Sequence, residues 1–526
     1  MKRLLPLIAA LLLAALPSAA SASATQESTF QDDPLLVYGT PEQVEDTLNQ
    51  LQAFGVDRIR VSIFWKILAP ANDAKQKPNF DATDPAGYQK PVWERYDALI
   101  RGALSRGILV NLNITSPIPR WAAGEPPASR PDLQPTWGPN PEEFGKFVQA
   151  VGKRYSGDYQ GLPRVDYWSI WNEPNQAGWL TPQWAPDPRN ASRRIESAPT
   201  VYRALAAAMW SGLAATGHGA DTILVGETAP QGQGSRKGVT QSIDALRFIR
   251  QLYCLDDNLN LLKGSSAQAR GCPVANPAQF VADKPALFRA TGYAHHPYDM
   301  LSPPARKARP ADWATMANLG DLSRELRRIY ARYGQKTQSR RGVPLYLTEY
   351  GYQTTPDPIH VSFAQQAAFL NEAEYIASRN PNVRTLSQFL LVDDKPDPAF
   401  STTTQSRLAW RTFQSGLTLQ SGKRKPAYRA YMTPLHLKTP RVRRGRAVGL
   451  FGMLRAANAS TRPAVSLQWR PRGATRWRTR RTLRVSGPRH YFNARMTVPG
   501  SGFVRLRWVN GRKALASRAA RVTVVR

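Results

Sequence analysis

The sequence predicts an α/β protein that consists of a (β/α)8 TIM barrel followed by a small antiparallel β-sandwich. Eight short β-branched runs alternate with helical patterns across the first 435 residues, and eight successive β-then-α units predict a closed parallel barrel. Beyond residue 435 the helical periodicity stops and short alternating runs remain. The chain has 526 residues, 42% of them apolar and 21% charged, which excludes disorder and fibrous repeats as the main architecture.

The first 24 residues have the pattern of an export signal. A cationic start at Met1-Lys2-Arg3 precedes an apolar run of 13 residues and the small-residue site Ala22-Ser23-Ala24. A membrane anchor is the alternative, but a span needs roughly 20 apolar residues. We therefore expect cleavage before Thr25 and no transmembrane segment in the mature chain. The protein would be secreted, and association with the cell wall is one possibility.

The expected strands are short runs of branched and aromatic residues, and amphipathic stretches separate them. We place the strands at 35–38, 58–64, 108–114, 165–171, 222–226, 291–295, 343–348 and 383–392. The helices are expected at 41–54, 93–105, 141–155, 201–215, 243–252, 319–333 and 363–376, with a last one near 427–431. An open doubly wound sheet is the alternative, but no Gly-rich phosphate loop follows the first strand.

Acidic side chains stand at two of the expected strand ends. Glu173 follows the fourth strand and Glu349 follows the seventh. The chemistry of a barrel is placed at the C-terminal ends of its strands, so these carboxylates should face each other across the mouth. Cleavage of a glycosidic bond needs such a pair, because one carboxyl protonates the leaving oxygen while the other attacks carbon or activates water.

Three motifs carry a resemblance to a known group of enzymes. Trp171-Asn172-Glu173-Pro174-Asn175 resembles the strand-four signature of the clan A glycoside hydrolases, and Thr348-Glu349-Tyr350-Gly351 resembles their strand-seven nucleophile. Gly55 to Arg60 is similar to the strand-two pattern of the clan. The resemblance covers roughly 35–435 and leaves families 39 and 5 as equal possibilities.

The resemblance implies a role for each matching residue. Glu173 would be the general acid and then the base, and Glu349 the nucleophile. The residues expected to contact the sugar or the nucleophile are Asn172, Arg60, His296 and Tyr298. An arginine beside Glu349 would lower the pKa of that carboxyl, and the resulting negative charge would raise the pKa of Glu173. Retention of configuration follows if the two carboxyls are about 5–5.5 Å apart.

A structural reading stands beside each of these roles. A glutamate at a strand end can be a salt-bridged residue, and Arg60 can neutralise a buried carboxylate inside the barrel. His296 can be a core histidine, and Glu227 is open between pocket lining and structural pairing. His295 and His296 are adjacent, and adjacent strand residues point to opposite faces, so at most one of them enters the site. We expect no metal and no cofactor.

The distance in sequence between the two carboxylates indicates long insertions. Glu173 and Glu349 are 176 residues apart, whereas three βα units account for only about 90. Trp179 in the first insertion, and Trp121 after the third strand, are candidate platforms for sugar rings, with loop packing as the alternative. Cys254 and Cys272 predict a disulfide across the third insertion, worth about 3 kcal/mol, rather than a metal site or a catalytic thiol.

The eighth strand departs from the clan pattern. Many clan A barrels place a tryptophan there beneath the sugar, but Ser387-Gln388-Phe389-Leu390-Leu391 contains none. Trp410 is a candidate substitute from the following loop. Sugar identity is therefore open.

The last 91 residues, 436–526, differ in charge from the barrel. They contain 23 Lys plus Arg and no Asp or Glu, within a chain of net charge +33. Strand-like runs at 465–469, 477–483, 492–498 and 503–508 resemble immunoglobulin-like or fibronectin-like modules. Such a surface suits an anionic wall polymer or envelope surface. We expect no nucleic-acid partner, because no reading motif is present; a solvated basic face without a ligand is the alternative.

The sequence as a whole predicts a secreted, monomeric, retaining glycoside hydrolase that cleaves O-glycosidic bonds of a poly- or oligosaccharide. Its domains are a signal peptide (1–24), a catalytic barrel (25–435) and a basic accessory domain (436–526). The alternatives are a non-catalytic carbohydrate- or wall-binding protein on a barrel scaffold, and a transglycosylase that uses the same intermediate.

Overall fold

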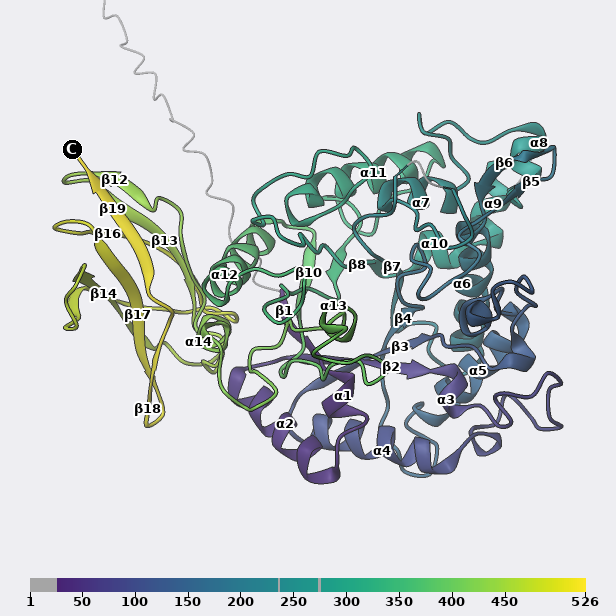
Figure 1. Ribbon diagram of the computed structural model, residues 1–526, viewed down its shortest axis with the longest axis horizontal. Coiled ribbons are helices and arrows are strands. Elements are labelled where there is room, and N and C mark those ends of the chain that lie inside the picture. Colours follow the sequence, from purple (N-terminus) through teal and green to yellow (C-terminus); the bar gives the residue numbers. More distant parts are fainter. Residues whose placement is uncertain (1–25, 235–236, 273–275) are drawn as a thin grey trace, which may run out of the picture.

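The computed structural model describes residues 26–234, 237–272 and 276–526, and it contains the expected barrel (Figure 1). Eight parallel strands close on themselves in the order β1-β10-β9-β8-β7-β4-β3-β2. Their bounds are β1 Glu27–Gln31, β2 Arg58–Phe64, β3 Leu109–Thr115, β4 Tyr167–Ile170, β7 Thr222–Thr228, β8 Gly292–His295, β9 Leu345–Leu347 and β10 Val383–Phe389. The predicted signal peptide lies outside the described residues.

The first strand is not where the sequence pattern placed it. The prediction of a strand at 35–38 is wrong, because Asp33–Leu36 forms the short helix α1. The side chain of Asp32 accepts a hydrogen bond from the backbone N–H of Leu35, and Pro34 follows at the start of the helix, which is a strong N-terminal signal. The true first strand, β1, has the mostly polar sequence ESTFQ, which an apolar pattern does not reveal.

Amphipathic helices surround the barrel (Figure 1). The longer ones are α2 Pro41–Phe54, α4 Lys90–Ser105, α5 Pro141–Arg154, α6 Ala198–Ala215, α7 Ala245–Leu252, α11 Leu319–Arg332, α12 Phe363–Arg379 and α14 Pro426–Met432. Short helices lie at α3 Trp65–Leu68, α13 Ser406–Ala409, η1 Pro85–Gly87, η2 Arg120–Ala122, η3 Pro131–Thr136 and η4 Met316–Asn318.

Helix α2 shows why the helix boundaries could be predicted. It begins with a reciprocal capping box between Thr40 and Gln43 and ends at Gly55, whose φ of 76° suits glycine. Leu48, Leu51 and Phe54 are buried against the barrel. Local signals thus set both ends, and the apolar face sets the orientation.

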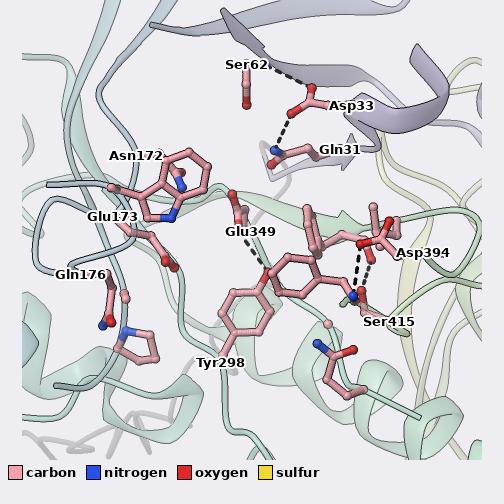
Figure 2. A pocket seen from close by; sticks show the side chains of 18 of the residues that line it. Gln31, Asp33, Ser62, Asn172, Glu173, Gln176, Tyr298, Glu349, Asp394 and Ser415 are labelled. Carbon is pink, nitrogen blue, oxygen red and sulfur yellow. Dashed lines mark hydrogen bonds between the residues drawn. The ribbon is translucent and has the colours of Figure 1, made fainter. Parts of the chain in front are cut away.

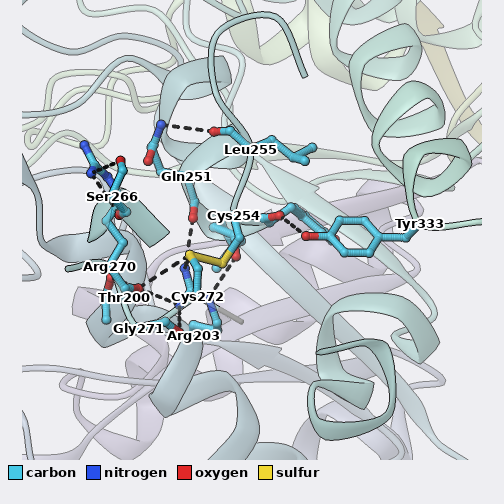
Figure 3. The surroundings of a disulfide bond; sticks show 12 residues. Thr200, Arg203, Gln251, Cys254, Leu255, Ser266, Arg270, Gly271, Cys272 and Tyr333 are labelled. Carbon is cyan, nitrogen blue, oxygen red and sulfur yellow. Dashed lines mark hydrogen bonds between the residues drawn. A yellow bond between two sulfur atoms is a disulfide. The ribbon is translucent and has the colours of Figure 1, made fainter. Parts of the chain in front are cut away.

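The insertions after strand β4 hold structure that the pattern did not predict. β5 Trp184–Asp187 and β6 Asn190–Glu196 form an antiparallel hairpin, and α8 Gly264–Gln268, α9 Pro277–Asp283 and α10 Pro285–Arg289 follow later. The predicted disulfide is present, with 5.7 Å between the Cα atoms of Cys254 and Cys272 (Figure 3). No helix within the described residues is both long and apolar enough to cross a bilayer.

The C-terminal region forms two β-sheets around a core of its own. One sheet has the order β11-β13-β16 and the other β12-β19-β17-β14-β15, with β18 paired to β17. The bounds are β11 Leu435–Leu437, β12 Arg441–Arg443, β13 Ala447–Met453, β14 Ala464–Pro471, β15 Arg478–Arg484, β16 Tyr491–Thr497, β17 Gly502–Asn510, β18 Lys513–Ala516 and β19 Ala520–Val525. The pairing is antiparallel except between β12 and β19, and the expected boundary at 435/436 falls inside β11.

Candidate active site

The polar residues at the strand ends meet in one pocket at the mouth of the barrel (Figure 2). Its volume is about 620 Å³. Asn172 and Glu173 enter it just after β4, Glu349 just after β9, and Tyr298 shortly after β8. Residues that are far apart in the chain therefore share one open space.

Glu173 and Glu349 lie close enough to act on one bond. One carboxylate oxygen of each, together with a ring nitrogen of His296, lie within 4.8 Å of one another. The side chains are 18% and 10% exposed, so both reach the pocket while most of their surface is buried. An acid and a nucleophile at the separation typical of retaining enzymes can occupy these positions.

Arg60 holds several acceptors in place from beneath the pocket. It is 1% exposed, and its Nη1 donates to Glu349 Oε1 at 2.8 Å. Its Nη2 donates to Asn172 Oδ1 at 2.6 Å and to Glu227 Oε2 at 3.0 Å. The guanidinium group thereby fixes the nucleophile and the asparagine in one rigid frame.

Tyr298 and His296 complete the surroundings of the two carboxylates. The hydroxyl of Tyr298 donates to Glu349 Oε2 at 3.1 Å, as Figure 2 shows. His296 is fully buried; its Nδ1 lies 2.9 Å from Glu173 Oε1 and its Nε2 lies 2.7 Å from Glu227 Oε2. His295 points elsewhere, toward Thr228 and the carbonyl of Ala314.

Glu227 is a site residue whose role the sequence left open. It is 0% exposed and does not line the pocket. It accepts hydrogen bonds from Arg60, from His296 and, at 2.7 Å, from the hydroxyl of Thr348. Glu227 is therefore a buried counter-charge behind the reacting pair, which is the structural pairing reading.

The charges of this cluster shift its pKa values strongly. Burial would raise the pKa of Glu227, but Arg60 and His296 outweigh it and lower the pKa to about 2. Burial would lower the pKa of His296, but the carboxylates of Glu349, Glu173 and Glu227 raise it to about 10. His296 is thus a cation at neutral pH that donates from both ring nitrogens.

The net effect on Glu349 differs from the expectation. Burial raises its pKa, and the opposing charges of His296 and Arg60 do not fully cancel that effect. The sequence-based expectation of a lowered pKa counted the arginine but not the extent of burial. The negative charge of the neighbouring Glu173 also raises the pKa of Glu349.

The backbone is unusual where the site is built. Trp171, Glu173 and Glu227 have φ values of 61°, 34° and 49°, in the left-handed region that residues other than glycine rarely adopt. Such conformations cluster at functional sites, where the surrounding structure holds them. In this barrel they turn the chain sharply at the ends of β4 and β7.

The candidate tryptophans divide into two groups. Trp179 lines the pocket. Trp121 does not: its ring lies between Trp65 and Phe80, at centroid distances of 6.1 and 5.8 Å, and its indole N–H donates to the carbonyl of Pro70. Trp184, the first residue of β5, is buried and is likewise absent from the lining.

Other lining residues were not singled out from the sequence. Phe389 at the end of β10 and Phe413, which follows α13, form an edge-to-face pair 5.2 Å apart. Trp410, the expected substitute, is not part of the lining. Gln31, Asp33 and Asp394 add polar groups on the same side (Figure 2).

Glu173, His296 and Glu349 also have the residue types of a metal site. However, both ring nitrogens of His296 are engaged by carboxylates, and its raised pKa makes the ring a cation, which repels a metal ion. The arrangement therefore fits carboxylate chemistry better than metal binding.

The comparison with protein families decides the affiliation that the motifs left open. The family model described as Cellulase (glycosyl hydrolase family 5) matches residues 19–383. The chain belongs to glycoside hydrolase family 5. This family 5 protein is accordingly a glycosidase, which favours an enzyme over the non-catalytic binding protein. No curated protein matches the chain.

Solved structures with a similar chain trace come from several glycosidase families. A family 39 glycoside hydrolase from the gut symbiont Bacteroides cellulosilyticus WH2 is 14% identical, with 90% of this chain and 79% of that chain covered and a TM-score of 0.48. GH5_18 from Streptomyces cattleya, in complex with GlcNAc, is 16% identical over 78% and 79%, with a TM-score of 0.45. The beta-glycosidase from Thermosphaera aggregans is 16% identical over 77% and 94%, with a TM-score of 0.42.

Proposed function

We propose that this family 5 glycosidase cleaves O-glycosidic bonds with retention of configuration, by double displacement. The observation that carries the proposal is the close approach of Glu173 and Glu349, whose carboxylate oxygens lie within 4.8 Å in one pocket. At that separation a carboxylate can attack the anomeric carbon directly, because no water molecule needs to fit between it and the sugar.

In the first step Glu349 attacks the anomeric carbon while Glu173 donates its proton to the leaving glycosidic oxygen. Arg60 and Tyr298 hold the two oxygens of Glu349 and thereby orient it. Asn172 uses its Oδ1 to accept from Arg60, which leaves its amide nitrogen for the sugar 2-hydroxyl. A covalent glycosyl ester on Glu349 results.

In the second step water hydrolyses the glycosyl ester. Glu173 gave up its proton in the first step and is now the base. Glu173 then takes a proton from water as the water attacks the anomeric carbon, and Glu349 is released. A sugar hydroxyl in place of water would give transglycosylation.

The pocket favours neutral sugars. Among the residues that the structure describes, its lining contains four carboxyl groups, those of Asp33, Glu173, Glu349 and Asp394, and no Lys or Arg. A uronic acid placed there would meet like charges, which costs binding energy. Trp179, Tyr298 and Phe389 offer aromatic surface for the apolar faces of sugar rings. The proposed substrate is therefore a neutral poly- or oligosaccharide.

The proposal includes the setting of the enzyme. The signal pattern in residues 1–24 supports a location outside the cytoplasm. There the basic residues 436–526 would hold the enzyme, as a monomer, on an anionic polymer or envelope surface. The charge of that region, 23 cations and no acidic residue, supports this role.

Substitution of the reacting pair tests the mechanism. Turnover of an activated aryl glycoside should fall at least about 1000-fold in Glu349→Ala and Glu173→Ala, and azide should rescue product formation in one or both. Proton NMR of the first product should show the anomer of the substrate, and mass spectrometry should detect one glycosyl group on Glu349.

Glu94→Gln is the matched control, because Glu94 is an exposed carboxylate on α4 with a single distant partner, Lys90, at 3.8 Å. It should leave turnover unchanged. Unaltered activity in Glu349→Ala, or an inverted first product, would refute the double displacement.

A further inference from the structure

A second large cavity lies between the barrel and the C-terminal domain. Its volume is about 1150 Å³, and its walls come from α12 and α14 on the barrel side and from β17, β18 and β19 on the other. Figure 1 shows β17 and β18 beside α14. We call it the junction groove; it shares no lining residue with the catalytic pocket.

All charged residues that line the junction groove are cations. Seven Lys or Arg side chains contribute to its lining and no Asp or Glu does. Lys425 is neutralised by Asp393. The other six have no carboxylate within 4.0 Å in the part of the chain that the structure describes: Arg424, Arg429, Arg505, Lys513, Arg518 and Arg521.

Arg505 shows how these cations are held. Its guanidinium lies 4.3 Å from the ring centroid of Trp477, and its Nε donates to Gln468 at 2.9 Å. Its two terminal nitrogens have no hydrogen-bond partner among the described residues. The aromatic ring fixes the guanidinium group but leaves its forked donors free for an anion.

Arg505 is repelled by cations in and around the groove. Burial first, and then the charges of Arg507, Arg429 and Arg470, lower the pKa of Arg505. Within residues 436–526, only Arg455 and Arg489 lie within 4.0 Å of a carboxylate in the described chain, and both carboxylates belong to the barrel. A bound anion would relieve this repulsion, so the groove is electrostatically incomplete by itself.

We propose that the junction groove binds a linear anionic polysaccharide that carries carboxylate or phosphate groups. This inference rests on the proposed anionic partner of residues 436–526 and names its site. The carboxylates of the catalytic pocket repel such a chain, so the same molecule offers separate places for a polyanion and for a neutral sugar. Binding in the groove would keep the barrel close to a wall matrix that also holds its substrate.

The aromatic residues favour a glycan over a single-stranded nucleic acid. Nucleic-acid channels use free aromatic faces on which bases stack. Here the guanidinium groups of Arg470 and Arg505 lie over the ring of Trp477, and Arg470 also lies over Phe503. The faces of these rings are covered by guanidinium groups, so they are not free to stack on bases, whereas the guanidinium groups can bind an anion.

A charge-neutralised groove tests the proposal in the full-length enzyme. The triple variant Arg429→Gln, Arg505→Gln and Lys513→Gln should weaken binding of polygalacturonate at least about tenfold at low salt, measured by titration calorimetry. The control triple Arg444→Gln, Arg446→Gln and Arg462→Gln removes the same charge from exposed residues outside the groove and should change binding less than about twofold.

The two triple variants distinguish binding in the junction groove from non-specific attraction to the basic surface. Equal weakening by the two triples, or none by the groove triple with an unchanged melting curve, would overturn the proposal. So would tighter binding of an oligothymidylate or of phosphatidylglycerol vesicles than of polygalacturonate at matched charge and salt. Aryl glycoside hydrolysis should stay at the wild-type level in both triples; an inactive wild type that still binds polygalacturonate through the groove would refute the hydrolytic mechanism alone.

Discussion

Glu227 does not line the pocket, yet it binds both of the buried cations that position the reacting carboxylates. It accepts hydrogen bonds from Arg60 and from His296, and Thr348 fills part of its remaining capacity. Because all of these groups are buried, neither cation can be compensated by water. Removal of the Glu227 charge should therefore change how Arg60 and His296 hold Glu349 and Glu173.

Glu227→Gln should lower kcat/KM about 10- to 100-fold and move the alkaline limb of the pH–rate profile to lower pH. The charge of Glu227 helps to raise the pKa of His296 to about 10, so its loss lets His296 lose its proton at lower pH. The pH dependence of aryl glycoside turnover measures this. Glu325→Gln, which removes a buried partner of Arg250 outside the pocket, should leave the limb in place.

His296 also links stability to pH. Its pKa in the folded protein, about 10, is above its ordinary value of 6.5. Its stabilising contribution is therefore complete below pH 6.5 and is lost as the pH rises through about 10. In urea titrations the free energy of unfolding of the wild type should fall across this window, and more steeply than that of Glu227→Gln; parallel curves would contradict the assignment.

At the scale of elements, the long insertion after β7 is held by covalent and polar links. Arg203 on α6 is buried and donates to the carbonyls of Leu252 and Gln251, each at 2.9 Å, and to that of Arg270 at 3.1 Å (Figure 3). Burial lowers its pKa to about 10. The disulfide closes the same segment, so α6, the end of α7 and the insertion form one unit.

Cys254→Ser with Cys272→Ser should lower the free energy of unfolding by about 3 kcal/mol, because the closed loop spans 18 positions and its entropy returns to the unfolded chain. Neither cysteine lines the catalytic pocket, so kcat at 25 °C should be unchanged. Thermal melting with and without a reducing agent checks this. The reductant should lower the Tm of the wild type but not that of the double variant; equal melting of the two proteins would disprove the stabilisation.

At the scale of the molecule, a buried ion pair joins the two domains. Arg455 of the C-terminal domain pairs with Glu374 on α12, and its Nε donates to the carbonyl of Tyr431 at 2.9 Å. The hydroxyl of Tyr491 donates to Glu374 at 2.7 Å. Both charged side chains are at most 5% exposed, so this ion pair is buried in the contact between the two domains.

Arg455→Met should destabilise the protein by about 3–5 kcal/mol, because it leaves Glu374 buried without its counter-charge. Addition of Glu374→Gln should recover part of the loss. Chemical denaturation measures both, and Arg441→Met, an exposed cation of the same domain, should change stability by less than about 0.5 kcal/mol. A cost below about 1 kcal/mol for Arg455→Met would show that the interface does not depend on this pair.

Local patterns determined most of the architecture. β2 was predicted to the residue at 58–64 and α2 at 41–54, because capping signals and apolar periodicity are encoded within each segment. The alternation of strand and helix fixed the strand ends that bear Glu173 and Glu349. It could not reveal β1, whose ESTFQ sequence becomes a buried strand only because β2 and β10 pair with it.

Contacts between distant segments were decided by the tertiary structure alone. The burial of Glu227, the engagement of Trp121 by Trp65 and Phe80, and the meeting of Phe389 with Phe413 depend on which strands and loops become neighbours. The same holds for the pKa of Glu349, which follows burial more than the identity of its partners. Residue types and their order along the chain determined which chemistry is possible, while desolvation and distance, which exist only in the closed barrel, determined how each group takes part.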